Sequence, residues 1–312
     1  MTPAPATGSG GHAHPAPAGP DMMELSVPVG EDVKLYIRHW PGTMPRPFLL
    51  VHGMASNARV WDEVAAHLAA AGHPVYAVDL RGHGGSDAPD HGYDTTTATA
   101  DLVTVGRAVG LTGAVVAGHS WGGNIALRLA AGHPALVAGV ALIDGGWTNL
   151  TTTVRSWQEC VAVAGTLRGP VTGTTAAGMR DYLRAAHPNW SPTAIEASMA
   201  DMRMEPDGSF TPRLSQPQYM SIVRSLWEDP PTGDFPAVTV PVFLLPAVPA
   251  ANPQWEQIVR GWVAAAEAAL PRATTRWYLD GEHYLQAQHP HRLADDLLDL
   301  VRVIGPPAPA GP

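Results

Sequence analysis

Short apolar runs alternate with segments of helical periodicity from Leu25 onward, and this alternation most constrains the fold. Continuous apolar runs of four to eight residues are typical of strands buried on both faces, as in parallel sheets covered by helices. The predicted strands are Phe48–Val51, Val75–Val78, 114–117, 140–143, 240–245 and 276–279. The chain is therefore expected to form an α/β fold with a mainly parallel central sheet and helices on both faces.

The alternation stops between about residues 147 and 235, where no strand-like run is evident and the sequence is polar and interrupted by proline. This pattern predicts a helical lid insertion, 147–235, within a core formed by 23–146 and 236–305. Residues 1–22 are rich in Pro, Ala, Gly and His and are expected to be a disordered leader, and 306–312 a flexible tail. The insertion is rich in tryptophan and methionine, which suits either an adaptable apolar surface or a small core of its own.

Composition excludes several classes of protein. The chain has 312 residues, of which 45% are hydrophobic, and no window approaches the ~20 apolar residues of a spanning helix. The formal charge is −9 and Lys34 is the only lysine, so no basic surface for nucleic acid or an anionic membrane is expected. Cys160 is the only cysteine, which excludes an intrachain disulfide and a cysteine-based zinc cluster. A cytoplasmic location is the resulting expectation.

The strongest chemical signal is a G-x-S-x-G motif, Gly118 to Gly122, centred on Ser120. It lies between the predicted strand 114–117 and a helical segment. A serine in so sharp a strand-to-helix turn needs neighbours without side chains two positions away on either side. The motif predicts that Ser120 is an exposed nucleophile, with an ordinary helix-capping serine as the alternative.

A serine hydroxyl needs a base that accepts its proton, and His283 is the predicted base. It follows the last predicted strand and precedes a helix that begins near Pro290, whereas His289 and His291 fall at the start of that helix. The oxyanion of a tetrahedral intermediate needs two backbone N–H donors, and the sequence positions of Met54 and Trp121 fit these two places. His52 is expected to be structural, with its imidazole bonded to nearby backbone.

Together these motifs resemble the α/β-hydrolase-fold serine hydrolases, over about residues 25–304. The matching pieces are the His52-Gly53 turn, the stretch 78–86, the motif around Ser120 and the Gly-x-His pattern at His283. The resemblance implies the α/β-hydrolase fold with a helical lid. It also implies that Asp79, Arg81 and His83 in the stretch 78–86 are scaffold rather than catalyst.

The triad acid departs from the common pattern of this family. The family commonly places the acid in the loop after the strand that follows the lid, and here that loop, residues 246–253, has no carboxylate. Other members place it after the strand that follows the nucleophile helix, which makes Asp144 the predicted acid. The alternatives are that Asp144 only caps the turn at Gly145, or that Glu256 reaches back from the following helix.

The predicted chemistry is acyl transfer to water through an acyl-enzyme on Ser120, without a metal or an organic cofactor. Relatives that open epoxides or remove halide need a carboxylate nucleophile, so Ser120 argues against both reactions. The insertion predicts a small-molecule substrate with a hydrophobic or aromatic acyl part, contacted by Trp147. An esterase or lactonase is favoured. Amide or small-peptide hydrolysis, β-diketone cleavage, perhydrolysis and ligand binding without turnover are the alternatives.

Overall fold

The computed structural model describes residues 21–167, 174–248, 253–279 and 281–307. An eight-stranded sheet forms the centre, in the order β1-β2-β4-β3-β5-β6-β10-β12. The pairs from β4 to β12 are parallel, and β1 and β2 are antiparallel at one edge. These strands are β1 Met23–Pro28, β2 Lys34–Trp40, β3 Phe48–Val51, β4 Val75–Val78, β5 Ala114–His119, β6 Val137–Ile143, β10 Val242–Leu245 and β12 Ala273–Thr275.

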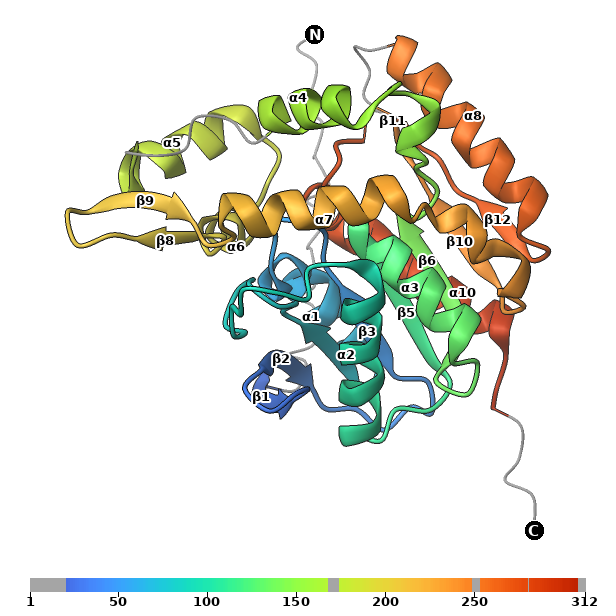
Figure 1. The fold of residues 1–312 in the computed structure, drawn as a ribbon. Coiled ribbons are helices and arrows are strands. Elements are labelled where there is room, and N and C mark those ends of the chain that lie inside the picture. Colours follow the sequence, from blue (N-terminus) through green and yellow to red (C-terminus); the bar gives the residue numbers. More distant parts are fainter. Residues whose placement is uncertain (1–20, 168–173, 249–252, 280, 308–312) are drawn as a thin grey trace, which may run out of the picture.

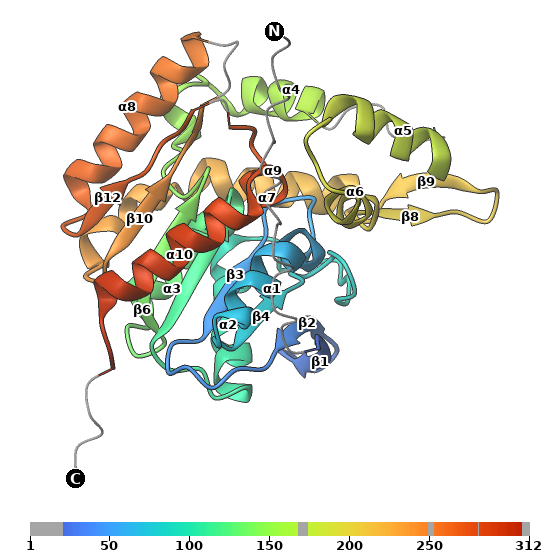
Figure 2. The same cartoon turned by 180° about the vertical axis from the view of Figure 1, so that it is seen from behind.

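Helices cover both faces of the sheet, as predicted. The helical elements of the core are η1 Ala58–Trp61, α1 Asp62–Ala70, α2 Thr95–Ala108, α3 Trp121–Gly132, η4 Phe235–Ala237, α8 Pro253–Ala269, α9 Leu285–Gln288 and α10 Pro290–Ile304. Helices α2 and α3 lie on one face (Figure 1) and α1 and α10 on the other (Figure 2). No helix in the described ranges is both long enough and apolar enough to cross a lipid bilayer.

Two hydrophobic clusters explain why the apolar runs are continuous. Leu49 and Val51 of β3 join the cluster that packs against α2 and α3, whereas Phe48 and Leu50 join the cluster beneath α1 and α10. Alternate side chains of a strand point to opposite faces, so a strand that is covered twice must be apolar at every position. This sandwich fixes the carboxyl ends of β3, β5, β6 and β10 at one edge of the sheet.

The segment 147–235 is inserted after β6 and lies across that edge (Figures 1 and 2). Its elements are η2 Leu150–Thr152, α4 Trp157–Leu167, β7 Thr174–Thr175, α5 Ala176–Ala186, α6 Pro192–Met199, β8 Met202–Met204, β9 Ser209–Pro212, α7 Gln216–Glu228 and η3 Pro231–Gly233. The expectation of a strand-free insertion is wrong, because β7, β9 and β8 form a three-stranded antiparallel sheet. These strands are short and largely polar, so they show no apolar run.

The insertion has a small core of its own. Met179, Leu183, Ile195, Met199 and Phe210 form a separate buried cluster. This favours the second explanation of the methionine-rich composition, since Met179 and Met199 pack within the insertion instead of presenting an apolar surface.

Two other expectations need adjustment. The predicted strand 276–279 is reduced to β13 Tyr278–Leu279, which pairs with β11 Ala247–Val248 outside the main sheet, and the last position in the main sheet is taken by β12. The leader 1–22 lies outside the described residues as far as residue 20, and the tail 306–312 lies outside them from residue 308.

Candidate active site

Ser120 occupies a sharp turn between β5 and α3. Its backbone has φ 52° and ψ −120°. A Cβ atom on Gly118 would lie 2.2 Å from the carbonyl oxygen of Gly122, and one on Gly122 would lie 2.4 Å from the carbonyl oxygen of Val51. Both distances are far below a possible contact, so the two glycines of the motif allow the start of α3 to pack against β5 and the end of β3.

Backbone strain is concentrated around this turn. In the described ranges, the non-glycine residues with positive φ are Ala55, Ser120 and Asp144, with φ values of 54°, 52° and 40°. Such conformations are costly for residues with a side chain and persist where the surrounding structure imposes them, often at functional sites. All three residues lie in loops at the carboxyl ends of parallel strands, directly after β5 and β6 and shortly after β3.

The predicted oxyanion donors border the same turn. Gly53 lies against the serine, since a Cβ atom there would be 2.9 Å from Cβ of Ser120. Met54 is the next residue and is half-buried. Trp121 is the first residue of α3, so its N–H is among those that have no acceptor within the helix. The structure thus places the His52–Met54 turn against Ser120, which directly precedes α3.

The structure brings Asp144 and His283 together. Nδ1 of His283 lies 2.6 Å from Oδ2 of Asp144, and the backbone N–H of Ala247 donates to Oδ1 of Asp144 at 3.0 Å. The Asp144 side chain is 16% exposed, while that of His283 is 49% exposed. A carboxylate that accepts from Nδ1 leaves Nε2 of the imidazole free to accept a proton from a substrate or a nucleophile.

Comparisons with known proteins agree with the fold. A family model described as alpha/beta hydrolase fold matches residues 46–167. The crystal structure of E-2-(acetamidomethylene)succinate hydrolase matches with a TM-score of 0.74 and 22% identity, over 90% of this chain and 99% of that chain. An esterase structure from M. tuberculosis matches with a TM-score of 0.68 and 24% identity, over 90% of this chain and 92% of that chain. The chain belongs to the α/β-hydrolase superfamily.

The relatives of this α/β hydrolase are named for different activities. A non-heme chloroperoxidase of Streptomyces lividans is 34% identical over 120 residues, which are 38% of this chain and 44% of that protein. A 2-(acetamidomethylene)succinate hydrolase of Mesorhizobium japonicum is 29% identical over 181 residues, 58% of this chain and 63% of that protein. The chain thus spans less than two thirds of the length of either relative.

Glu256 lies apart from the hydrogen-bonded pair of Asp144 and His283. It is in the first turn of α8, as expected from its position, and its carboxylate accepts from Nε of Arg260 at 2.8 Å, one helical turn away. No hydrogen bond joins Glu256 to His283 in the described ranges. Part of the loop before α8, residues 249–252, lies outside those ranges.

Trp147 is placed differently from the expectation of a substrate contact. Its side chain is 3% exposed and belongs to the large cluster beneath α2 and α3. In this conformation it presents almost no surface to a ligand, because the core covers it. Contact between Trp147 and a substrate therefore stays a prediction.

His52 and His83 are both held by hydrogen bonds to the backbone. Nε2 of His52 accepts from Leu80 N–H at 3.0 Å, so its proton is on Nδ1, which donates to the carbonyl oxygen of Gly53 at 2.7 Å. His83 is held in the same way, and burial lowers its pKa to about 4. Both imidazoles are therefore neutral structural groups that shape the loop beside Ser120.

His119 is a site residue that sequence reasoning did not find. Its Nε2–H donates to the backbone carbonyl of His283 at 2.8 Å, and its ring centroid lies 4.6 Å from that of His283. Burial and the neighbouring His283 imidazole lower the pKa of His119 well below the ordinary value, so it donates as a neutral imidazole. His119, which directly precedes Ser120, thus anchors the loop that carries His283. The only sequence feature that pointed to His119 was its position inside the G-x-S-x-G motif.

The insertion also contacts the His283 loop. Nδ1 of His187, just after α5, lies 2.5 Å from Oε2 of Glu282, and the His187 ring stacks on Trp190 at 3.9 Å. Trp190 in turn meets Tyr284 edge to face, with a centroid distance of 5.7 Å. These contacts join segments nearly a hundred residues apart and have no local sequence signature. Glu282 and Tyr284, on either side of His283, are thus both held by the insertion.

The described ranges contain no group of three or more His, Cys, Asp and Glu side chains arranged to hold a metal ion.

Proposed function

We propose that this α/β hydrolase is a serine hydrolase that cleaves a carboxylic ester, lactones included, with a hydrophobic or aromatic acyl part. The observation that carries the proposal is the Asp144–His283 hydrogen bond of 2.6 Å beside the strained turn of Ser120. A serine held in such a turn and an imidazole oriented by a carboxylate are the parts that acyl transfer needs.

The reaction follows from these groups. Nε2 of His283 takes the proton of the Ser120 hydroxyl as Oγ attacks the substrate carbonyl carbon. The N–H groups of Met54 and Trp121 stabilise the oxyanion. The tetrahedral intermediate collapses to an acyl-enzyme, and the leaving alkoxide receives the proton from His283. A water molecule, deprotonated by the same imidazole, then attacks the acyl carbon and restores Ser120.

Asp144 controls the protonation state of the base. Its Oδ2 accepts from Nδ1–H, which keeps the other nitrogen free in the resting enzyme and stabilises the imidazolium during the reaction. The bond from Ala247 N–H to Oδ1 fixes the carboxylate, so rotation of Asp144 cannot release His283 without the loss of a second hydrogen bond.

Amide hydrolysis is the second candidate, and the name of the Mesorhizobium relative favours it, since 2-(acetamidomethylene)succinate contains an acetamido group. Binding of a substrate amine by acidic residues of the insertion has less support. Those acids already have partners: Glu196 with Arg180, Asp201 with Asn57, Glu205 with Arg203, Asp207 with Ser209 and Glu228 with Arg224.

The test measures hydrolysis of p-nitrophenyl esters of increasing acyl length, a lactone panel and matched anilides, for wild type and Ser120→Ala. We expect ester or lactone turnover by wild type, its loss in Ser120→Ala, and labelling of Ser120 by a serine-directed phosphonate. A higher kcat/KM for anilides would move the assignment to amides. Ligand binding without turnover in both folded proteins would overturn the hydrolase proposal.

Perhydrolysis is separated by one further assay. Hydrogen peroxide can replace water as the attacker of the acyl-enzyme, which releases a peracid that oxidises halide. Bleaching of monochlorodimedone in acetate, peroxide and bromide, absent with Ser120→Ala, would assign that activity.

A further inference from the structure

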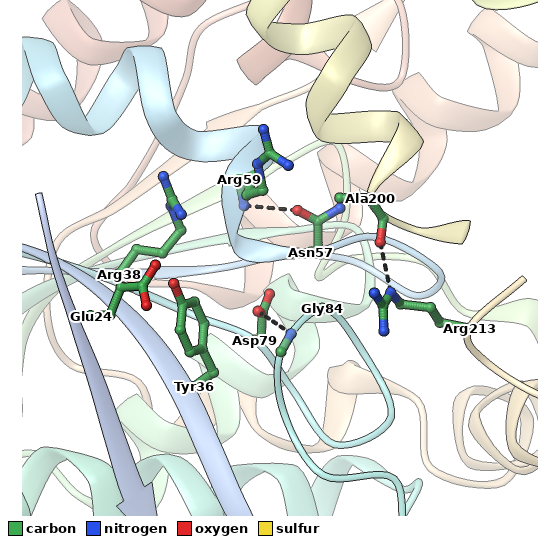
Figure 3. A pocket seen from close by; sticks show the side chains of 10 residues that line it. Glu24, Tyr36, Arg38, Asn57, Arg59, Asp79, Gly84, Ala200 and Arg213 are labelled. Atoms are coloured by element: carbon green, nitrogen blue, oxygen red, sulfur yellow. Dashed lines mark hydrogen bonds between the residues drawn. The ribbon is translucent and has the colours of Figure 1, made fainter. Parts of the chain in front are cut away.

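A polar pocket of about 360 Å³ lies where the core meets the insertion (Figure 3). It is lined by Glu24, Tyr36, Arg38, Asn57, Arg59, Asp79, Gly84, Gly85, Ala200 and Arg213. The core contributes all of these except Ala200 and Arg213, which belong to the insertion. Neither Ser120 nor His283 nor Asp144 lines it, so the pocket is separate from the candidate active site.

Three arginines from three segments of the chain line this pocket: Arg38 from β2, Arg59 from η1 and Arg213 from the segment after β9. Arg38 is already paired, with Nε and Nη2 bonded to the Asp62 carboxylate at 2.8 and 3.0 Å. The Arg59 side chain makes no hydrogen bond or ion pair to any described residue. Arg213 uses only Nε, which donates to the carbonyl oxygen of Ala200 at 3.0 Å. Arg59 and Arg213 therefore keep most of their N–H donors for a ligand.

The acidic groups of the pocket do not balance these donors. Both oxygens of Asp79 are occupied, since Oδ1 accepts from Ala58 N–H at 2.5 Å and Oδ2 from Gly85 N–H at 2.8 Å. The Asp79 side chain is buried, and this burial raises its pKa to about 6. Glu24, on the exposed edge strand β1, is the other carboxylate. The pocket is thus richer in free donors than in free acceptors.

We propose that this pocket binds a small anion of the carboxylate or phosphate class, held between Arg59 of the core and Arg213 of the insertion. The planar guanidinium fork matches two oxygens of either group, and charge-assisted hydrogen bonds are the stronger kind. Figure 3 shows Arg38 and Arg213 at opposite ends of the pocket, with Asn57 and Arg59 between them.

The bound anion would join the insertion to the core. The two parts already meet beside the pocket, where Asn57 Nδ2 donates to the carbonyl oxygen of Ala197 at 2.8 Å. An anion that bonds to both Arg59 and Arg213 adds a further link across the same boundary. Ligand binding is therefore expected to slow amide hydrogen exchange in residues 200–213.

The test titrates Ser120→Ala protein with sodium phosphate, sodium succinate and neutral succinamide by isothermal titration calorimetry at constant ionic strength. We expect saturable binding of phosphate or succinate, or of both, and none of succinamide. The anion that binds with the lower Kd shows whether the pocket prefers a phosphate or a carboxylate ligand. Because the Ser120→Ala background removes turnover, the result is independent of the proposed hydrolase function.

Matched variants locate the site. Arg59→Gln with Arg213→Gln should weaken anion binding by about tenfold or more for each arginine, on the order of one charge-assisted hydrogen bond. The control, Arg107→Gln with Arg203→Gln, removes the same charge from the surface of α2 and from β8 and should bind as the parent does. Equal affinity in both double variants, or no saturable binding in the folded parent, would overturn the proposal. Circular dichroism and hydrogen exchange check the fold and the predicted protection.

Discussion

Replacement of Asp144 by asparagine should nearly abolish turnover while the fold is kept. In the wild type, Asp144 Oδ1 accepts from Ala247 N–H and Oδ2 from His283 Nδ1–H. The asparagine carbonyl can keep only one of these acceptor roles. If it keeps the Ala247 bond, its NH₂ group faces Nδ1 of His283 and favours the tautomer with the proton on Nε2, which cannot accept the proton of Ser120.

The expected loss is about 10³- to 10⁴-fold in kcat, or on the order of 4–5 kcal/mol of transition-state stabilisation. This is far more than the ~1–3 kcal/mol of a single charged hydrogen bond, because the wrong tautomer disables the base as well. The assay is p-nitrophenyl ester hydrolysis, with the melting temperature as the measure of the fold.

Glu256→Gln is the matched control, since it also neutralises one carboxylate and disturbs only the surface pair with Arg260. It should retain near wild-type kcat. If Asp144→Asn retains more than about a tenth of wild-type kcat while Glu256→Gln loses activity, the assignment of the acid to Asp144 is refuted.

Three further perturbations test the surroundings of the site. Gly53→Ala adds a Cβ atom 2.9 Å from Cβ of Ser120, so the oxyanion loop or the serine must shift and kcat should fall by about 10²-fold; an unchanged kcat would contradict this packing. His187→Ala removes the 2.5 Å contact to Glu282 and should lower kcat several-fold with hydrogen exchange of residues 281–284 increased, whereas equal exchange would show that the insertion does not hold this loop. Burial lowers the pKa of His83 from 6.5 to about 4, so on acidification the unfolded chain gains a proton at this residue before the folded protein does. The contribution of His83 should therefore lower the free energy of unfolding by up to about 3 kcal/mol between pH 6.5 and 4. Urea titrations of His83→Gln should show a free energy of unfolding that changes less steeply with pH.

The parts of the fold that could be predicted are those whose cause is local in the sequence. A strand covered on both faces must be apolar throughout, so Phe48–Val51 and its neighbours were evident from the residues alone. The turn at Ser120 was predictable for a similar reason, because Gly118 and Gly122 leave no room for a side chain.

The small sheet of the insertion was missed because its strands are short and lie at the surface. One signal was present: Asp207 and Gly208 form a turn dipeptide between β8 and β9, and such dipeptides favour hairpins. The contact between His187 and Glu282 had no such signal. It depends on how the insertion packs against the core, which no window of sequence records.

The position of Asp144 shows how a carboxylate outside the loop after β10 can bond to His283. Strands β6 and β10 are parallel neighbours, with Ile143 paired to Leu245, so the residues that follow them leave the sheet side by side. Asp144 follows β6 directly, and its carboxylate bonds to the N–H of Ala247 just after β10. Asp144 at the end of β6 thus reaches the His283 imidazole, and the loop after β10 supplies the backbone donor that fixes its carboxylate. The orientation of His283 thus depends on two adjacent strand ends, which is why a single motif in the sequence could not reveal it.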